Sequence, residues 1–289
     1  SASVSSIFGF SLSQMNMGEL KNDGFEFQLS HNNHINDFTY GVSANFSIIR
    51  NEVITLGLAD VQQANGLVGN GTYFVGYPMD IYYGYKTDGV FIDEQDIAAW
   101  PDQNAIAKNP KVGDIRYVDF NEDGKVDAND RTILGSRIPK FTYGLSLNMG
   151  WKGFDFSAQF QGVADVKGYL SGYAGNAFFG YGSIQRWMAD DYFNPEHPKR
   201  YPAYPRLEII NNSSNNTLTS DFWVRDASYL RVKSIQLGYT LPQSWTKKFG
   251  INNFRIYAQS ENPITFHNYP EGWDPEINTD GNYYPILKT

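Results

Sequence analysis

The side chains best suited to bind a metal ion are concentrated in one stretch, "DFNEDGKVDAND", which runs from Asp119 to Asp130. Its oxygen-bearing side chains fall at the ligand positions of an EF-hand-type loop, and Gly124 falls where that loop turns sharply and a Cβ is unwelcome. Hard oxygen ligands at this spacing favour Ca2+ over zinc or copper. We therefore predict a structural Ca2+ site. Its candidate ligands are Asp119, Asn121, Asp123, the Lys125 carbonyl, Asp127 and Asp130.

A second interpretation of this stretch stays open, because Asp, Asn and Gly are also common in turns that bind nothing. The last ligand position holds Asp130, a shorter side chain than the bidentate glutamate of standard EF-hands, and no strong helical pattern flanks the loop. Even a filled site would only brace a loop. The function must therefore come from the elements around it.

Composition excludes several classes of protein. The chain has 289 residues, a formal net charge of −8, 20 Tyr, 20 Phe and no Cys. The acidic balance argues against a nucleic-acid partner, which requires a basic face. The lack of cysteine excludes zinc-thiolate sites, catalytic thiols and disulfides. The sequence also contains no apolar run long enough for a membrane helix.

The strongest pattern alternates apolar and polar residues with period two. It is clearest in "FTYGVSANFSI", "FTYGLSLNMG" and "GFDFSAQFQG", and it recurs in "GFEFQLS", "SIQLGYTL" and "NFRIYAQS". Such segments are strands with two different faces. We expect one face to hold Phe38, Tyr40, Val42, Leu145, Leu147, Phe156 and Phe160. The other should hold Ser43, Asn45, Ser146, Asn148, Ser157 and Gln159.

A soluble sandwich would bury the apolar face, whereas a transmembrane barrel would turn it to lipid. Three observations favour the barrel. Two segments alternate over about ten residues, the length of a tilted membrane strand. Trp151 and Trp245 flank short connections, as interfacial aromatic residues do. Short connections, including "HNNHIND" and "WKG", alternate with long ones at roughly 50–137, 164–225 and 264 onward. We predict six strands in three hairpins, with short strands in "YYGYKTDGVF" and "GDIRYVDF".

The stretch "GDIRYVDFNEDGKVDANDRTILGSRIPKFTYGLSLNMGWKGFDFSAQFQG" closely resembles the C-terminal half of SusC-like (SusC/RagA) TonB-dependent transporters. The likeness rests on the Asp/Asn/Gly loop, on residues 138–144 leading into a strand, on the turn at 152–154 and on Gln161-Gly162. Three further segments match in the same order: "GYPMDIYYGYKTDGVF", "DASYLRVKSIQLGYTLP" and "YPEGWDPEIN". Each piece is weak alone, but the combination is specific and spreads over most of the chain.

The resemblance implies that residues 1–289 are the C-terminal portion of a 22-stranded, plugged outer-membrane barrel from a Gram-negative, Bacteroidetes-like cell. It implies import of bulky glycan or peptide nutrients, with energy delivered by TonB through the plug and cargo captured by a SusD-like surface lipoprotein. We expect the plug, the N-terminal strands and the final strand to lie outside this sequence. The first and last strands should therefore need partners from the rest of the transporter, because unpaired edges are costly in lipid.

Two other classes of protein fit parts of the sequence less well or only in part. An enzyme is disfavoured, because no HExxH, GxSxG or phosphate-binding loop occurs and His31 and His34 are expected in a solvated turn. A soluble, calcium-stapled β-sandwich that binds carbohydrate would fit the Asp-rich loop and the aromatic content. It would dissolve without detergent, whereas a barrel segment would partition with membranes.

A last set of candidates lies in the aromatic stretch "GYAGNAFFGYGSIQRWMADDYF". Its rings could line the mouth of the barrel and stack on sugars or peptide side chains, or they could pack the long loop against its neighbours. The candidate substrate-binding residues are Tyr173, Phe178, Phe179, Tyr181 and Trp187.

Overall fold

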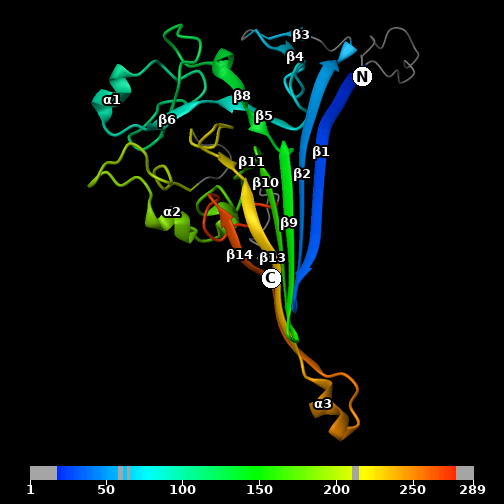
Figure 1. Cartoon of the computed structure of the whole chain (residues 1–289). Coiled ribbons are helices and arrows are strands. Elements are labelled where there is room, and N and C mark those ends of the chain that lie inside the picture. Colours follow the sequence, from blue (N-terminus) through cyan, green and yellow to red (C-terminus); the bar gives the residue numbers. More distant parts are fainter. Residues whose placement is uncertain (1–17, 58–60, 64–65, 210–214, 278–289) are drawn as a thin grey trace, which may run out of the picture.

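The segments with period-two alternation form one antiparallel sheet with the order β1-β2-β9-β10-β13-β14 (Figure 1). The computed structural model describes residues 18–57, 61–63, 66–209 and 215–277. The six strands and three hairpins that the sequence predicts are confirmed. Residues 282–289, after which a final strand was expected, lie outside the described part. The strands are β1 (Glu19–Ile35), β2 (Phe38–Thr55), β9 (Phe141–Trp151), β10 (Phe154–Ala164), β13 (Tyr229–Thr240) and β14 (Arg255–His267).

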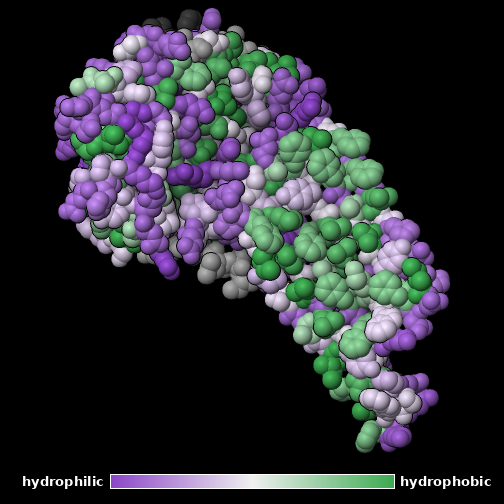
Figure 2. All heavy atoms as spheres, turned by 60° about the vertical axis from the view of Figure 1, so that its left-hand side comes forward, coloured by the Kyte–Doolittle hydropathy of each residue, from purple (hydrophilic) through white to green (hydrophobic). Residues whose placement is uncertain are grey.

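The register of the sheet pairs apolar residues with apolar residues and polar residues with polar residues on neighbouring strands. Val42 pairs with Leu147, and Leu147 pairs with Ala158; one step along, Ser43 pairs with Ser146, and Ser146 with Gln159. Because side chains alternate strictly between the two faces, this register gathers the apolar residues on one face and the polar residues on the other. The predicted division of the strands into two faces is confirmed. Figure 2 shows apolar side chains gathered over the sheet, beside a hydrophilic loop region.

The short turns lie at one end of the sheet. Lys152 and Gly153, with φ of 46° and 90°, make the two-residue turn between β9 and β10. The expectation for "HNNHIND" was wrong in its extent, because β1 continues to Ile35 and only residues 36–37 turn. His31 and His34 are therefore strand residues, paired with Val42 and Thr39. Pairing with β2 gives this segment ladder hydrogen bonds along one edge, which a longer polar turn would lack.

The long connections contain short elements of their own. Strands β5 and β8, β6 and β7, and β11 and β12 pair as two-stranded sheets, so the short strands predicted in the first long loop are confirmed. Among the described residues, no helix is long and apolar enough to cross a membrane, a result that concerns helices alone. The elements are β3 (Val61–Gln62), β4 (Val68–Gly69), β5 (Ile81–Tyr85), β6 (Thr87–Val90), α1 (Glu94–Ala99), β7 (Ile115–Tyr117), η3 (Ala128–Asp130), β8 (Arg131–Ser136), β11 (Lys167–Tyr169), η4 (Phe179–Tyr181), α2 (Arg186–Asp190) and β12 (Val224–Asp226).

These loops pack together around a hydrophobic core, which we call the loop core. Its largest fully buried members are Trp223, Tyr117, Tyr204, Ile115 and Leu170, and they come from two different long loops. Burying that much aromatic surface offsets the conformational entropy of ordering long connections. The long loops therefore form a packed layer, which we call the loop layer, at the end of the sheet opposite the short turns (Figure 1).

Candidate functional site

The polar face of the sheet consists mostly of uncharged hydrogen-bonding groups, with a few charged side chains such as Glu26, which pairs with Ser47. Ser30 and Ser43 join across β1 and β2 with an Oγ–Oγ distance of 2.8 Å, and Ser47 joins Thr142 across β2 and β9 at 2.6 Å. Glutamine amides continue the same face on β10 and β13, where Gln159 pairs with Ser234. A face of this kind can exchange hydrogen bonds with a polar solute without binding it as tightly as a charged surface would.

One ion pair crosses this face near the short turns. The guanidinium of Arg255 donates to both carboxylate oxygens of Asp155, with Nε 3.0 Å from Oδ1. The two residues lie on β14 and β10 and meet over Gly238 of β13, where an added Cβ would come within 2.6 Å of both side chains. The glycine therefore makes the fork-shaped contact possible across an intervening strand.

At the other end, the last described loop is held against the polar face. Arg231 of β13 pairs with Gln161 in the ladder, so its side chain lies on the polar face. Its guanidinium donates to Asp274 at 2.6 Å and to Thr265 at 2.8 Å. Nη1 is also 3.3 Å from Glu276, close enough for an ion pair but not aligned for a hydrogen bond. This contact places residues 268–277 over the loop-side end of the polar face.

Two tryptophans join this last loop to the loop core. The indole N–H of Trp273 donates to Gln185 Oε1 at 2.6 Å, and the indole N–H of Trp187 donates to the same oxygen at 3.1 Å. Trp273 is buried in the same cluster as Trp187. The last loop is therefore fixed on one side by charge and on the other by aromatic packing.

A second charged cluster holds the first long loop to the second. Arg116 is buried and donates to Asp88 and, at 2.9 Å, to Asp96, while Arg200 donates to Asp96 at 2.6 Å. The indole ring of Trp100 lies 3.8 Å from the Arg116 guanidinium carbon. Burial alone would raise the pKa of the Asp96 carboxyl, but the hydrogen bonds from Arg200 and the Ile92 amide, together with the Arg116 charge, lower it.

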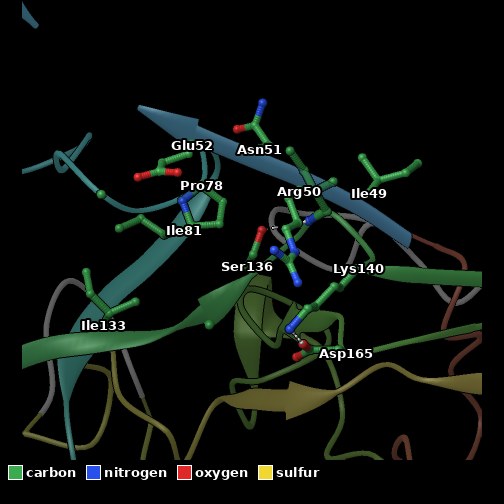
Figure 3. Close-up of a pocket in the computed structure, with 13 residues that line it drawn as sticks. Ile49, Arg50, Asn51, Glu52, Pro78, Ile81, Ile133, Ser136, Lys140 and Asp165 are labelled. Carbon is green, nitrogen blue, oxygen red and sulfur yellow. Dashed lines mark hydrogen bonds and ion pairs between the residues drawn. The ribbon is translucent and has the colours of Figure 1, made fainter. Parts of the chain in front are cut away.

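A cavity of about 380 Å³ opens where β2 leaves the sheet and the β5–β8 pair begins (Figure 3). Its lining combines isoleucines, among them Ile81 and Ile133, with charged side chains from β2 and from the residues just before β9 and just after β10. The Lys140 ammonium points at Asp165, 3.8 Å away, and both side chains are exposed. An exposed pair of this kind contributes little to stability, and the mixed charges of the lining favour no single ligand class.

The residues predicted to bind calcium form a hydrogen-bonded loop. Asp119 accepts from the Asp123 and Gly124 amides at 3.1 and 2.7 Å, and Asp130 accepts from the Phe120 and Asp127 amides at 2.8 and 2.6 Å. The Asn121 amide also donates to Asp130, and the Lys125 amide donates to Asp123, each at 3.2 Å. Within the described ranges, no group of three or more His, Asp or Glu side chains is placed to hold a metal. Calcium binding would therefore require some carboxylates to turn from their amide donors, and it stays a prediction.

The Lys125 side chain adds a charge to this loop that its predicted role did not include. Its ammonium lies 2.8 Å from Asp127, and this contact lowers the pKa of the Asp127 carboxyl. Asp127 also caps η3 through the Asn129 amide at 2.8 Å. Asn121 accepts from the Asp123 amide at 3.0 Å. The loop is thus braced by its own polar groups.

The five aromatic residues proposed to contact substrate are in different environments. Trp187 is buried in the loop core, and Phe178 packs against it. Tyr173 and Phe179 meet edge to face with ring centroids 5.0 Å apart. Tyr181 alone among the five is fully exposed. The structure therefore brings Tyr173 and Phe179 together, places Trp187 in a packing role, and leaves Tyr181 accessible.

The two ion-pair clusters were missed by reasoning from the sequence. Arg231 carried one signal, because it lies at a polar-face position of a strand that has few charges. Its partners Asp274 and Glu276 lie far along the chain, in a segment noted only for its resemblance. No spacing rule connects Asp88, Asp96, Arg116 and Arg200, since they meet through tertiary packing.

The arrangement defines a class of protein. An antiparallel sheet with one apolar and one polar face, short turns at one end and a layer of packed loops at the other is typical of the wall of a transmembrane β-barrel. The apolar face is open to the surroundings: Phe25, Leu29 and Leu237 are 61%, 60% and 55% exposed. A sandwich would cover these residues with a second sheet, and the described residues supply only two-stranded pairs besides the main sheet.

Comparison with known proteins agrees with this class. The chain is 30% identical to TonB-dependent receptor P3 of Formosa agariphila over 93% of its own length and 26% of that protein. It is 26% identical to TonB-dependent receptor SusC of Bacteroides thetaiotaomicron over 95% of its length and 26% of that protein. The structure of the RagAB peptide transporter matches with a TM-score of 0.65 and 22% identity, over 97% of this chain and 29% of that one. No family model matches the chain.

The resemblance to SusC-like TonB-dependent transporters that the motifs predict is therefore confirmed over nearly the whole chain. The all-β barrel fold is confirmed as well, with a sheet that is not closed within the described residues. The chain spans about a quarter of the length of the curated relatives it matches. All of the relatives named here are receptors or transporters, which supports the prediction that the chain is not an enzyme.

Proposed function

We propose that this chain forms part of the barrel wall and the external loops of a TonB-dependent importer in the outer membrane of a Gram-negative bacterium. The observation that carries the proposal is the register that aligns one apolar and one polar face across six strands. Lipid would cover the apolar face, since large side chains such as Phe25 and Leu29 have no other cover. The polar face would line the lumen and meet the plug.

The proposed cargo is a bulky polar nutrient, an oligosaccharide or a peptide. One structural relative is named a peptide importer, and another relative is SusC. A lumen lined by serine, asparagine and glutamine suits both cargoes, because each carries many hydrogen-bonding groups and no required net charge. Among the predicted aromatic contacts, Tyr181 is the residue best placed to meet a cargo or a partner from outside.

The proposed partners follow from the same assignment. A SusD-like surface lipoprotein would cap the loop layer and deliver cargo, and the rest of the transporter would pair with the free edges of β1 and β14. Rows of unpaired N–H and C=O groups are costly in lipid, so these edges need strands from elsewhere. TonB would supply energy through the plug.

The test is uptake by cells that lack the gene and are complemented with the complete protein. We would compare labelled peptides with labelled oligosaccharides. A variant with Ser146→Trp and Gln159→Trp fills the polar face and should reduce uptake of the true cargo, whereas Leu147→Trp on the apolar face should leave it nearly unchanged. Equal uptake by all three proteins at equal surface levels would refute a lumen on the polar face.

A further inference from the structure

The connection between β13 and β14, which we call the hairpin tip (residues 241–254), differs from the other short turns. It contains α3 (Gln243–Thr246) and η5 (Lys247–Phe249) and projects from the end of the sheet opposite the loop layer (Figure 1). Its large apolar side chains are exposed: Trp245 by 62%, Phe249 by 80% and Phe254 by 43%. A cluster of this size in water marks a surface that meets something else.

The charge of this region is opposite to that of the chain. Residues 227–260 contain no Asp or Glu, although the whole sequence has 31 acidic residues and a net charge of −8. Arg231 and Lys233 are neutralised by the last loop, and Arg255 by Asp155. Lys247 and Lys248 remain, and the described part of the chain gives neither an ion pair. The hairpin tip therefore carries two uncompensated positive charges beside its aromatic residues.

The backbone of the hairpin tip brings its aromatic side chains together. The helical turn ends at Gly250, whose φ of 71° only glycine adopts easily. Trp245 and Phe249 are four residues apart on this turn, which brings such side chains to the same side of a helix. The exposed apolar residues Leu237 and Ile256 lie on the strands just before and after the hairpin tip. The exposed aromatic residues of the hairpin tip are thus flanked in the chain by exposed apolar residues of both strands.

The neighbouring turn repeats the combination of an aromatic ring and a lysine. Trp151 is 52% exposed, and the Lys152 ammonium lies 5.5 Å from the centre of its ring. Lys152 is also 3.7 Å from Asp37, so its charge is partly matched. Tryptophan and lysine side chains at the end of an apolar band are typical of the membrane interface, where lipid acyl chains meet the headgroups.

We propose that the hairpin tip docks in the headgroup layer of the phospholipid leaflet on the short-turn side, with Lys247 and Lys248 on the phosphates of anionic lipids. The inference rests on the proposed membrane-spanning function. Trp245 and Phe249 lie at the boundary of the acyl chains, where amphipathic rings are stable. The two ammonium groups gain from a negative surface potential that falls off within a Debye length.

The experiment uses the complete protein, reconstituted in nanodiscs of phosphatidylcholine with or without phosphatidylglycerol. The test variant is Lys247→Gln with Lys248→Gln. The control is Lys108→Gln with Lys111→Gln, which removes the same charge from the loop layer. Mass spectrometry of retained lipid gives the preference for phosphatidylglycerol. We expect the preference for phosphatidylglycerol to fall on the order of tenfold in the test variant. The wild type should lose the same preference in high salt. The control should keep it.

A second measurement locates the tryptophan. Brominated lipids should quench the fluorescence of Trp245, which is identified as the part of the signal that the Trp245→Phe variant lacks. Equal lipid preference in the wild type and the test variant, or no quenching at Trp245, would overturn the inference and would assign the hairpin tip to a protein partner instead. A protein that inserts and imports cargo without the lipid preference would refute the docking alone. A protein that does not enter the nanodiscs would refute the proposed function as well.

Discussion

The guanidinium of Arg231 on β13 lies 2.6 Å from the carboxylate of Asp274, which is 43 residues further along the chain. Arg231 is 2% exposed and the Asp274 side chain 9%. Two charges this deeply buried are retained at a cost in solvation, so their pairing fixes where the last loop lies. That loop covers the loop-side end of the polar face.

Arg231→Ala should release this loop. The substitution leaves Asp274 buried without its cation, whereas Glu276 keeps Lys233 at 3.1 Å. Removing one member of a buried pair costs about 3–5 kcal/mol. The measurement is the rate of proteolysis within residues 268–277 in the complete protein. Arg186→Ala is the control, because Arg186 is 82% exposed and 3.5 Å from Asp190, and it should change little. Equal cleavage of the two variants would contradict the assignment.

Leu147→Arg and Ser146→Arg should differ sharply although the residues are adjacent. An arginine on the lipid side of a barrel costs about 2–4 kcal/mol near the midplane, whereas a lumen position tolerates charge. Heat-modifiable migration and unfolding in lipid would measure the difference. A larger loss for Ser146→Arg would reverse the orientation of the sheet.

Gly84→Ala should destabilise the loop core. A Cβ at this position of β5 would lie 2.1 Å from the backbone carbonyl oxygen of Thr219, which cannot move like a flexible side chain. Overpacking of this kind costs about 1–3 kcal/mol. Hydrogen exchange of the β5 and β8 amides gives the readout. Gly18→Ala is the matched control, since its Cβ would meet only the Thr55 carbonyl oxygen at 3.4 Å; similar exchange in both variants would count against the close contact.

We propose that Ca2+ binds the loop from Asp119 to Asp130 after its carboxylates turn from their amide donors. Calcium should then slow hydrogen exchange in this loop, and a chelator should speed it without unfolding the sheet. Asp123→Asn should weaken the response, whereas Asp190→Asn, at an exposed position of α2, should not. A well-resolved map made with calcium present, in which the Asp119 and Asp123 oxygens point apart, would refute the site.

The cluster around Asp96 predicts how the loop layer responds to acid. The folded-state pKa of Asp96 lies below its ordinary value of 3.8, so the carboxylate contributes stability above that pH and loses it as pH falls through the lowered pKa. The contacts of Arg116 and Arg200 should therefore survive to below about pH 4. Proteolysis of the loops as a function of pH measures this. Asp96→Asn should weaken the layer at neutral pH and flatten its acid dependence, and an unchanged profile would exclude Asp96 as the cause.

Local sequence patterns were sufficient to predict the strands and their two faces. Alternation with period two is a local property, since neighbouring side chains of a strand must point in opposite directions. The segments from Phe141 to Trp151 and from Phe154 to Ala164 are therefore where the sequence predicts them. The short strands of the first long loop and the turn at Lys152 and Gly153 follow from equally local signals. The extent of β1 did not, because the polar residues from His31 to His34 gain strand structure only by pairing with β2.

Tertiary structure alone decided which charges meet. Arg231 finds Asp274, and Arg116 finds Asp88 and Asp96, because the loops fold back on the sheet and on one another. Packing likewise separated the aromatic candidates, burying Trp187 and leaving Tyr181 exposed. Such pairings depend on distances between segments far apart in the chain. A spacing along the sequence carries no information about those distances, whereas it fixes the direction of every side chain within a strand.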